Sequence, residues 1–112
     1  MVTRVTNQDF EDKVLKSDLP IFACFTTSWC HSCFALCLVT EDLAKEYEGR
    51  IKFVEIDAEQ EPKLMERYRL RALPAVLIFR GGKPVKKLLG FHSRGALRSL
   101  LNALAARKQE DI

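Results

Sequence analysis

Blocks of apolar residues separated by polar stretches predict alternating strands and helices along this chain. Residues 21–25 and 75–79 are continuously apolar, which is typical of strands covered on both faces of a sheet. More mixed apolar blocks predict further strands at residues 2–5, 51–56 and 85–89. Strand-helix-strand units favour a parallel sheet with right-handed crossovers.

Apolar residues three or four positions apart predict helices between these strands. Thr6 and Asn7 are expected to cap a first helix, because their side-chain oxygens accept from unpaired N–H groups at a helix start. The longest predicted helix covers residues 30–47. Pro62 suits the first position of a short third helix, and Ser93 is expected to cap the last one.

The end of the chain modifies this parallel arrangement. Gly81 and Gly82 predict a two-residue hairpin turn, which makes the last strands antiparallel. Pro84 marks the final strand as an edge, because it has no N–H to pair with a neighbour. The predicted fold is therefore α/β, with a mixed central sheet and helices on both faces. Since the chain has 112 residues, we expect one domain over residues 1–112.

Composition narrows the class of protein. The apolar share of 47% and the charged share of 29% are those of a globular chain, and the net charge is only +3. The most basic stretch, residues 80–87, has no interleaved aromatic residues, so we expect a solvated edge strand and no nucleic-acid partner. No apolar run approaches bilayer length, and the first residues lack the apolar core of a secretory signal. We therefore expect a cytoplasmic protein with no membrane contact.

The candidate chemistry lies in the tetrapeptide Cys30-His31-Ser32-Cys33. It follows a buried strand and begins the longest helix, where unpaired N–H groups favour a thiolate and lower the pKa of the first thiol. The thiolate is the form that attacks disulfides. Two other interpretations stay open: a structural zinc site, although a second ligand pair at suitable spacing is absent from the sequence, and a redox-silent remnant.

The chain resembles the thioredoxin family from about residue 10 to residue 104. The features that carry the resemblance are Trp29 directly before the Cys-x-x-Cys motif, Leu73-Pro74 before a buried strand, the Gly81-Gly82 hairpin and Gly90 after the last strand. This resemblance implies the thioredoxin fold, a mixed sheet of about five strands flanked by four α-helices.

The resemblance also implies an activity, the exchange of a dithiol for a disulfide on protein substrates. Cys30 would attack and form a mixed disulfide, and Cys33 would resolve it, without a metal or organic cofactor. Pro74 would be cis and lie beside the cysteine pair, and the backbone of Leu73 would pair with the bound substrate. Other residues would border the substrate groove: Trp29, Phe34, Gly90 and Phe91. A thioredoxin reductase is one candidate electron donor, and a monomer is expected.

The chain departs from the family pattern at the motif, because thioredoxins carry Gly-Pro where His31-Ser32 stands. One hypothesis is that His31 stabilises the Cys30 thiolate and makes the pair more oxidising; the other is that His31 points into water. The direction of exchange therefore stays open. An oxidase or isomerase-like activity is one alternative, and a redox-inactive module that binds peptides through the apolar groove is another.

A second departure lies beneath the motif. Thioredoxins carry a buried aspartate where Cys24 stands and a lysine where Glu55 stands. That aspartate assists proton transfer at the inner cysteine, so a water molecule or Glu55 would have to replace it, or Glu55 is only a solvated strand residue. Cys37 shares a helical face with Cys33. Cys24 and Cys37 are interpreted as small buried hydrophobes, and a second redox pair is the alternative.

Overall fold

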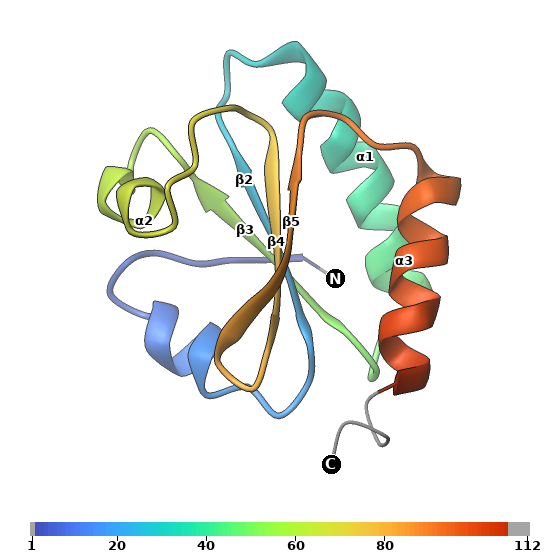
Figure 1. The fold of residues 1–112 in the computed structure, drawn as a ribbon. Coiled ribbons are helices and arrows are strands. Elements are labelled where there is room, and N and C mark those ends of the chain that lie inside the picture. Colours follow the sequence, from blue (N-terminus) through green and yellow to red (C-terminus); the bar gives the residue numbers. More distant parts are fainter. Residues whose placement is uncertain (1, 108–112) are drawn as a thin grey trace.

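The computed structural model describes residues 2–107, in which five strands form one mixed sheet in the order β1-β3-β2-β4-β5 (Figure 1). β1 and β2 run parallel to β3, whereas β4 is antiparallel to β2 and β5 is antiparallel to β4. The predicted mixed sheet is therefore confirmed. The strands are β1 (Val2–Arg4), β2 (Ile21–Thr26), β3 (Lys52–Asp57), β4 (Ala75–Arg80) and β5 (Lys83–Leu89).

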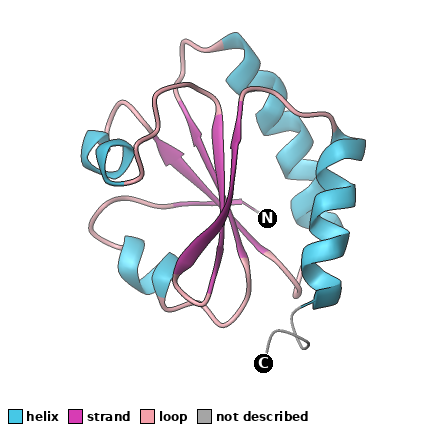
Figure 2. Ribbon diagram, viewed as in Figure 1, coloured by secondary structure: helices cyan, strands magenta, loops and turns pink. Residues whose placement is uncertain are grey.

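Helices cover both faces of this sheet, as predicted (Figure 2). One face carries the two long helices, α1 (His31–Glu46) and α3 (Arg94–Arg107), and the other carries η1 (Glu11–Leu15) and α2 (Pro62–Arg67). The N-terminal caps of the last two helices follow the expectation. Pro62 is the first residue of α2, and the Ser93 hydroxyl accepts from the N–H of Ala96 at 3.2 Å.

Successive residues of β2 point to opposite faces of the sheet, as strand geometry requires. Ile21, Ala23 and Phe25 belong to the apolar cluster beneath η1 and α2. Phe22 and Cys24 belong to the cluster beneath α1 and α3. The side chain of Cys24 therefore lies on the face that α1 covers.

The segment after β1 differs from the prediction of a capped helix. Only Glu11–Leu15 is helical, and it has π geometry, with Phe10 at its N-cap position and no side-chain cap. The Asp9 carboxylate instead accepts from the Thr6 N–H at 2.7 Å and from the Thr6 hydroxyl at 3.1 Å. This local turn competes with a helix start at Thr6 and Asn7. The first of the four helices is thus a single π-helical turn.

The hairpin that ends the sheet begins where the glycines predict it. Gly81 and Gly82 have φ values of +60° and +81°, as a two-residue hairpin turn of this kind requires at both central positions. β5 begins earlier than predicted, so Pro84 lies inside the strand, opposite Phe79 and beside a register shift. Such an irregularity at a sheet edge tolerates a residue without an N–H.

Candidate active site

Three loops meet at one end of the sheet. Because Phe25 pairs with Ala75 in antiparallel register, the chain that leaves β2 lies beside the chain that enters β4. The peptide bond between Leu73 and Pro74 is cis, as the resemblance implies. The N–H of Gly90 donates to the Pro74 carbonyl at 2.7 Å, which joins the end of β5 to the same edge. The chain that leaves β2 is the loop that leads into α1, so this loop lies at the same end of the sheet (Figure 1).

The two cysteines of the motif are joined as a disulfide at the start of α1, with their Cα atoms 5.1 Å apart. Cys30 is the N-cap residue of the helix and is partly exposed, whereas Cys33 is only 1% exposed. An approaching substrate therefore reaches the sulfur of Cys30 and not that of Cys33.

The surroundings of Cys30 favour a negative charge on its sulfur. The backbone N–H of Cys33 donates to Cys30 Sγ at 3.2 Å, and the Ser32 hydroxyl lies 3.5 Å from the same atom. The partial positive charge of the helix N-terminus adds to these contacts. His31 is exposed at the first residue of α1, so its effect on Cys30 stays a prediction.

Exposed apolar side chains flank the disulfide. Trp29 precedes Cys30 and is 69% exposed, Phe34 follows Cys33 and is 68% exposed, and Phe91 beside Gly90 is 48% exposed. Large exposed apolar side chains near a reactive group are typical of a binding surface. Leu73 is half-buried and Pro74 is buried at the same edge. The part of each residue in substrate binding stays a prediction.

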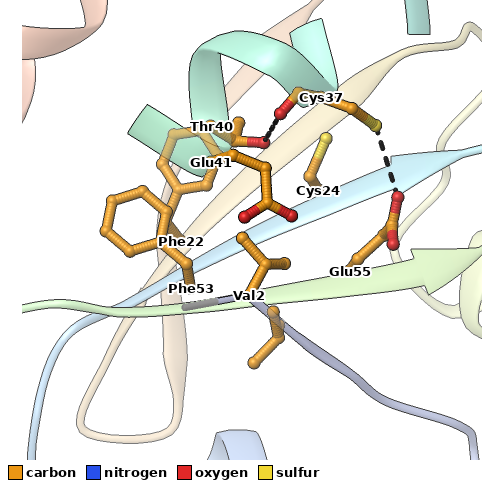
Figure 3. Close-up of a pocket in the computed structure, with 9 residues that line it drawn as sticks. Val2, Phe22, Cys24, Cys37, Thr40, Glu41, Phe53 and Glu55 are labelled. Atoms are coloured by element: carbon orange, nitrogen blue, oxygen red, sulfur yellow. Dashed lines mark hydrogen bonds between the residues drawn. The ribbon is translucent and has the colours of Figure 1, made fainter. Parts of the chain in front are cut away.

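Beneath the motif, a carboxylate stands beside two further thiols (Figure 3). Glu55 of β3 pairs in register with Cys24 of β2. Glu55 Oε2 accepts from Cys37 Sγ and from the Thr26 hydroxyl, each at 3.3 Å. Arg4 contacts the other carboxylate oxygen at 3.5 Å. Three side chains thus contact the Glu55 carboxylate, and its part in proton transfer stays a prediction.

Both free thiols stay protonated at neutral pH. Burial, followed by the hydrogen bond to Glu55 and the charge of Glu55, raises the pKa of Cys37 to about 11. Burial above all raises the pKa of Cys24 far above its usual range. Because a protonated thiol is a poor nucleophile, this favours a packing role for Cys24. The hydrogen bond that Cys37 donates was not foreseen from the sequence.

A cavity of about 190 Å³ lies between the start of α1 and the ends of β2 and β3. Cys33 and Glu55 both line it, together with Arg4, Thr26, Thr27, Ser28, Phe34, Cys37 and Asp57. Of the residues that line this cavity, sequence reasoning missed Arg4, Thr26, Thr27, Ser28 and Asp57. The signal available was the polar pair Thr26-Thr27, which follows a continuously apolar run shortly before the motif.

Neither a metal-binding cluster nor a membrane-spanning helix is found in the part of the chain described. Over residues 2–107 no three His, Cys, Asp or Glu side chains gather in a way that could hold a metal ion. In the same range no helix has the length and apolarity needed to cross a bilayer.

The fold and this site together define a thiol–disulfide oxidoreductase: a substrate-accessible sulfur at a helix start, with its covered partner three residues on, beside a cis-proline at the edge of a mixed sheet. Comparison with known proteins agrees. A family model described as Thioredoxin matches residues 1–103.

Individual relatives show the same similarity over most of the chain. The thioredoxin of Rickettsia bellii is 31% identical over 102 residues, covering 91% of this chain and 97% of that protein. Thioredoxin 1 of Nostoc sp. is 34% identical over 87 residues, covering 78% and 81%. The thioredoxin of Porphyra purpurea is 34% identical over 101 residues, covering 90% and 94%. The chain belongs to the thioredoxin family and is a disulfide oxidoreductase that acts through Cys30 and Cys33.

Proposed function

We propose that this protein reduces disulfides in other proteins, as a cytoplasmic monomer that receives its electrons from a thioredoxin reductase. The observation that carries the proposal is the asymmetry of the cysteine pair, with Cys30 partly exposed at a helix N-terminus and Cys33 buried behind it. This asymmetry assigns attack to Cys30 and resolution to Cys33.

The reaction runs in two exchanges. The Cys30 thiolate attacks one sulfur of the substrate disulfide, and the other substrate sulfur leaves as a thiolate that takes up a proton. Cys33 then loses its proton and attacks Cys30 Sγ, which forms the intramolecular disulfide and releases the second substrate thiol. Two electrons pass from the protein to the substrate, and a reductase returns them by reducing the bond between Cys30 and Cys33.

The substrate would lie along the edge formed by Leu73 and Pro74. An extended peptide gains main-chain hydrogen bonds when it pairs with an exposed backbone segment. Trp29, Phe34 and Phe91 would supply apolar contacts around the reactive sulfur. Because these contacts do not depend on one side-chain pattern, we expect the protein to accept several protein disulfides.

Two features support the proposed compartment and oligomeric state. Cys24 and Cys37 are free thiols, which suits a reducing compartment. The edge strand β5 carries Lys83, Lys86 and Lys87, and charged side chains on an edge discourage strand pairing between copies. Sedimentation of the reduced protein tests the monomer, and a dimer at micromolar concentration would contradict it. Fractionation of the source cells tests the compartment.

One observation favours the alternative of a disulfide oxidase or isomerase. The Ser32 hydroxyl lies 3.5 Å from Cys30 Sγ. Stabilisation of the Cys30 thiolate by this hydroxyl would stabilise the reduced form and raise the reduction potential, by about 30 mV for each tenfold change in the equilibrium constant. A contribution of His31 would add to it. Equilibration with glutathione, for the wild type and for His31→Ala, measures this contribution. If the reduction potential of the wild-type protein lies near that of protein disulfide isomerase, the function would be oxidation or reshuffling of disulfides and not their reduction.

The central experiment is insulin reduction with dithiothreitol as electron donor. We expect Cys30→Ser to lose catalysis and Cys24→Ala, which also removes one thiol, to keep it. Equal activity in Cys30→Ser and wild type would favour a peptide-binding module. Replacement of dithiothreitol by a thioredoxin reductase and NADPH tests the donor separately. Activity with dithiothreitol but not with the reductase and NADPH would exclude that reductase as the donor. The proposed exchange chemistry would be unaffected.

A further inference from the structure

We propose that Glu55 takes up and returns the proton of Cys33 through water in the cavity they share, and that the Cys37 thiol positions the Glu55 carboxylate. This inference rests on the proposed function, because it concerns the second exchange of the same reaction. It makes Glu55 a catalytic residue of this chain and Cys37 a positioning residue that acts through Glu55.

The need for such a group follows from the burial of Cys33. Its side chain is 1% exposed, so bulk water has almost no access to the sulfur. The thiol must nevertheless lose its proton before it can attack Cys30. An acceptor that is fixed inside the protein and connected by water meets this need.

Two carboxylates line the cavity among the described residues, Glu55 and Asp57. Asp57 Oδ1 already accepts from the N–H of Glu59 at 2.9 Å and of Gln60 at 3.3 Å, in the turn before α2. Glu55 instead contacts Cys37, which lies one helical turn after Cys33 on α1. Glu55 is therefore the carboxylate of this cavity that contacts α1, the helix that carries Cys33.

The cavity is suited to hold the water that the transfer requires. Its volume of about 190 Å³ is room for several water molecules. Thr27 lines it and is only 8% exposed, yet its hydroxyl has no hydrogen-bond partner among the described residues. A buried hydroxyl without a protein partner is the kind of group that binds an internal water. The hydroxyl thus marks a water position beside Cys33 and Glu55.

The Glu55 carboxylate is held in place rather than free to rotate. Cys37 and Thr26 both donate to Oε2, from α1 and from β2 respectively. Because burial and Glu55 itself raise the pKa of Cys37 to about 11, this thiol remains a donor throughout the physiological range. Figure 3 shows the contact from Cys37 to Glu55, with Cys24 in the same pocket.

Charged and titratable groups face Glu55 from every neighbouring element. Arg4 of β1 lies 3.5 Å from Glu55 Oε1, and Cys24 of β2 lies beside Glu55 in register. Cys37 faces Glu55 from α1, and Glu41 lines the smaller pocket with it. Asp57 lies on the same side of β3 as Glu55, and its carboxylate contacts Arg4 at 3.7 Å. Arg4 thus contacts both carboxylates, Glu55 at 3.5 Å and Asp57 at 3.7 Å.

Glu55, as the carboxylate, receives through water the proton that leaves Cys33. The Cys33 thiolate forms a bond with Cys30 Sγ, the bond between Cys30 and the substrate breaks, and the electron pair leaves on the substrate sulfur. Glu55 then gives its proton to solvent or to the leaving sulfur. On reduction of the protein disulfide, Glu55 takes up a proton from solvent and passes it to the Cys33 thiolate.

The two exchanges can be timed separately with a small aromatic disulfide as substrate. Attack by Cys30 releases one coloured thiol, and attack by Cys33 on the mixed disulfide releases the second. For Glu55→Gln we expect the second release to slow about 100-fold or more at neutral pH, while the first keeps its rate. The difference should shrink as the pH rises, because hydroxide then deprotonates Cys33 directly.

Two control variants remove a neighbouring carboxylate without touching Glu55. Glu41→Gln removes a charge from the smaller pocket, and Asp57→Asn removes the other carboxylate of the shared cavity. We expect both to keep the pH profile of the second release. An unchanged second release in Glu55→Gln, or a loss in Asp57→Asn alone, would overturn the assignment. Absence of any second release in the wild type would instead overturn the proposed function.

The positioning role of Cys37 has its own comparison. Cys37→Ala removes the donor to Glu55, whereas Cys37→Ser keeps a hydroxyl in its place. We expect the second release to slow about three- to tenfold in Cys37→Ala, by the loss of roughly one hydrogen bond, and to recover in Cys37→Ser. Equal rates in wild type and Cys37→Ala, with both folded by circular dichroism, would overturn this part.

Discussion

The four cysteines form two pairs whose surroundings differ sharply. Cys30 and Cys33 lie at the start of α1, where an N–H and a hydroxyl approach the outer sulfur and solvent reaches it. Cys24 and Cys37 lie deeper, between α1 and the sheet, where burial and the Glu55 carboxylate oppose a negative charge. The same functional group is therefore a nucleophile in one place and a protonated, unreactive group in the other.

The comparison shows that the reactivity of a thiol depends on the hydrogen-bond donors around its sulfur and on its access to water. The helix N-terminus favours the thiolate, and a carboxylate nearby disfavours it. Cys37 lies one turn after Cys33 on α1. It is therefore farther from the helix N-terminus, and it lies beside the Glu55 carboxylate.

The largest expected effect concerns alkylation of the reduced protein. With a pKa of about 11, Cys37 is a thiolate in about one molecule in ten thousand at pH 7. We expect iodoacetamide to modify Cys30 at least about 100-fold faster than Cys37, as followed by mass spectrometry of peptides. The rate at Cys37 should rise about tenfold per pH unit until about pH 11. Comparable rates at pH 7 would remove the contrast.

The next effect concerns a charge introduced beneath the motif. Cys24→Asp places a carboxylate beside Glu55 at a position that is 2% exposed. We expect the free energy of unfolding to fall by about 2–4 kcal/mol, because two like charges share a buried site. Adding Glu55→Lys should restore at least about 1 kcal/mol, since the pair then has opposite charges. Urea denaturation of the single and double variants measures the coupling, and additive effects would show that the two positions do not interact.

A smaller effect is expected at the rim of the reactive pair. Trp29→Ala removes an exposed aromatic side chain next to Cys30. We expect KM for insulin to rise about three- to tenfold, while the rate with a small disulfide stays unchanged, because only a protein substrate reaches the rim. Phe10→Leu, a core change far from the rim, is the comparison for general effects. An equal loss with both substrates would place Trp29 in the chemistry instead.

The smallest effect concerns stability at alkaline pH. Well below pH 9 the Cys37 thiol is protonated whether the chain is folded or unfolded. Between about pH 9 and 11 the unfolded chain loses a proton that the folded protein keeps, so the free energy of unfolding falls as the pH rises. The slope should be less steep in Cys37→Ser, as measured by urea denaturation across this range. Parallel curves would mean that Cys37 titrates normally in the folded protein.

Much of the fold was predictable, because local patterns carry it. The continuous apolar run of β2 predicted a strand covered on both faces, and the pair Gly81-Gly82 predicted the hairpin. The first helix was not predictable in the same way. Whether Thr6 caps a helix or binds the Asp9 carboxylate is a choice between two local hydrogen bonds of similar strength. Sequence patterns alone do not decide such competitions.

The candidate site, like the fold, was predictable only in part. The spacing of Cys30 and Cys33 and their place before a helix identified the reactive pair directly. The partners of Glu55 were not visible, because Cys37, Thr26 and Arg4 come from three different elements. The unpartnered hydroxyl of Thr27 likewise has meaning only once the cavity is seen.

The order of elements, the reactive thiols and the class of reaction could be predicted from the sequence, since they depend on residues close together along the chain. The side chains that surround the Glu55 carboxylate, and the cavity that it shares with Cys33, are visible only in the folded protein. Hydrogen bonds and burial act over a few ångströms in space. Residues such as Arg4, Cys37 and Glu55 reach that range only when the sheet and α1 have packed together.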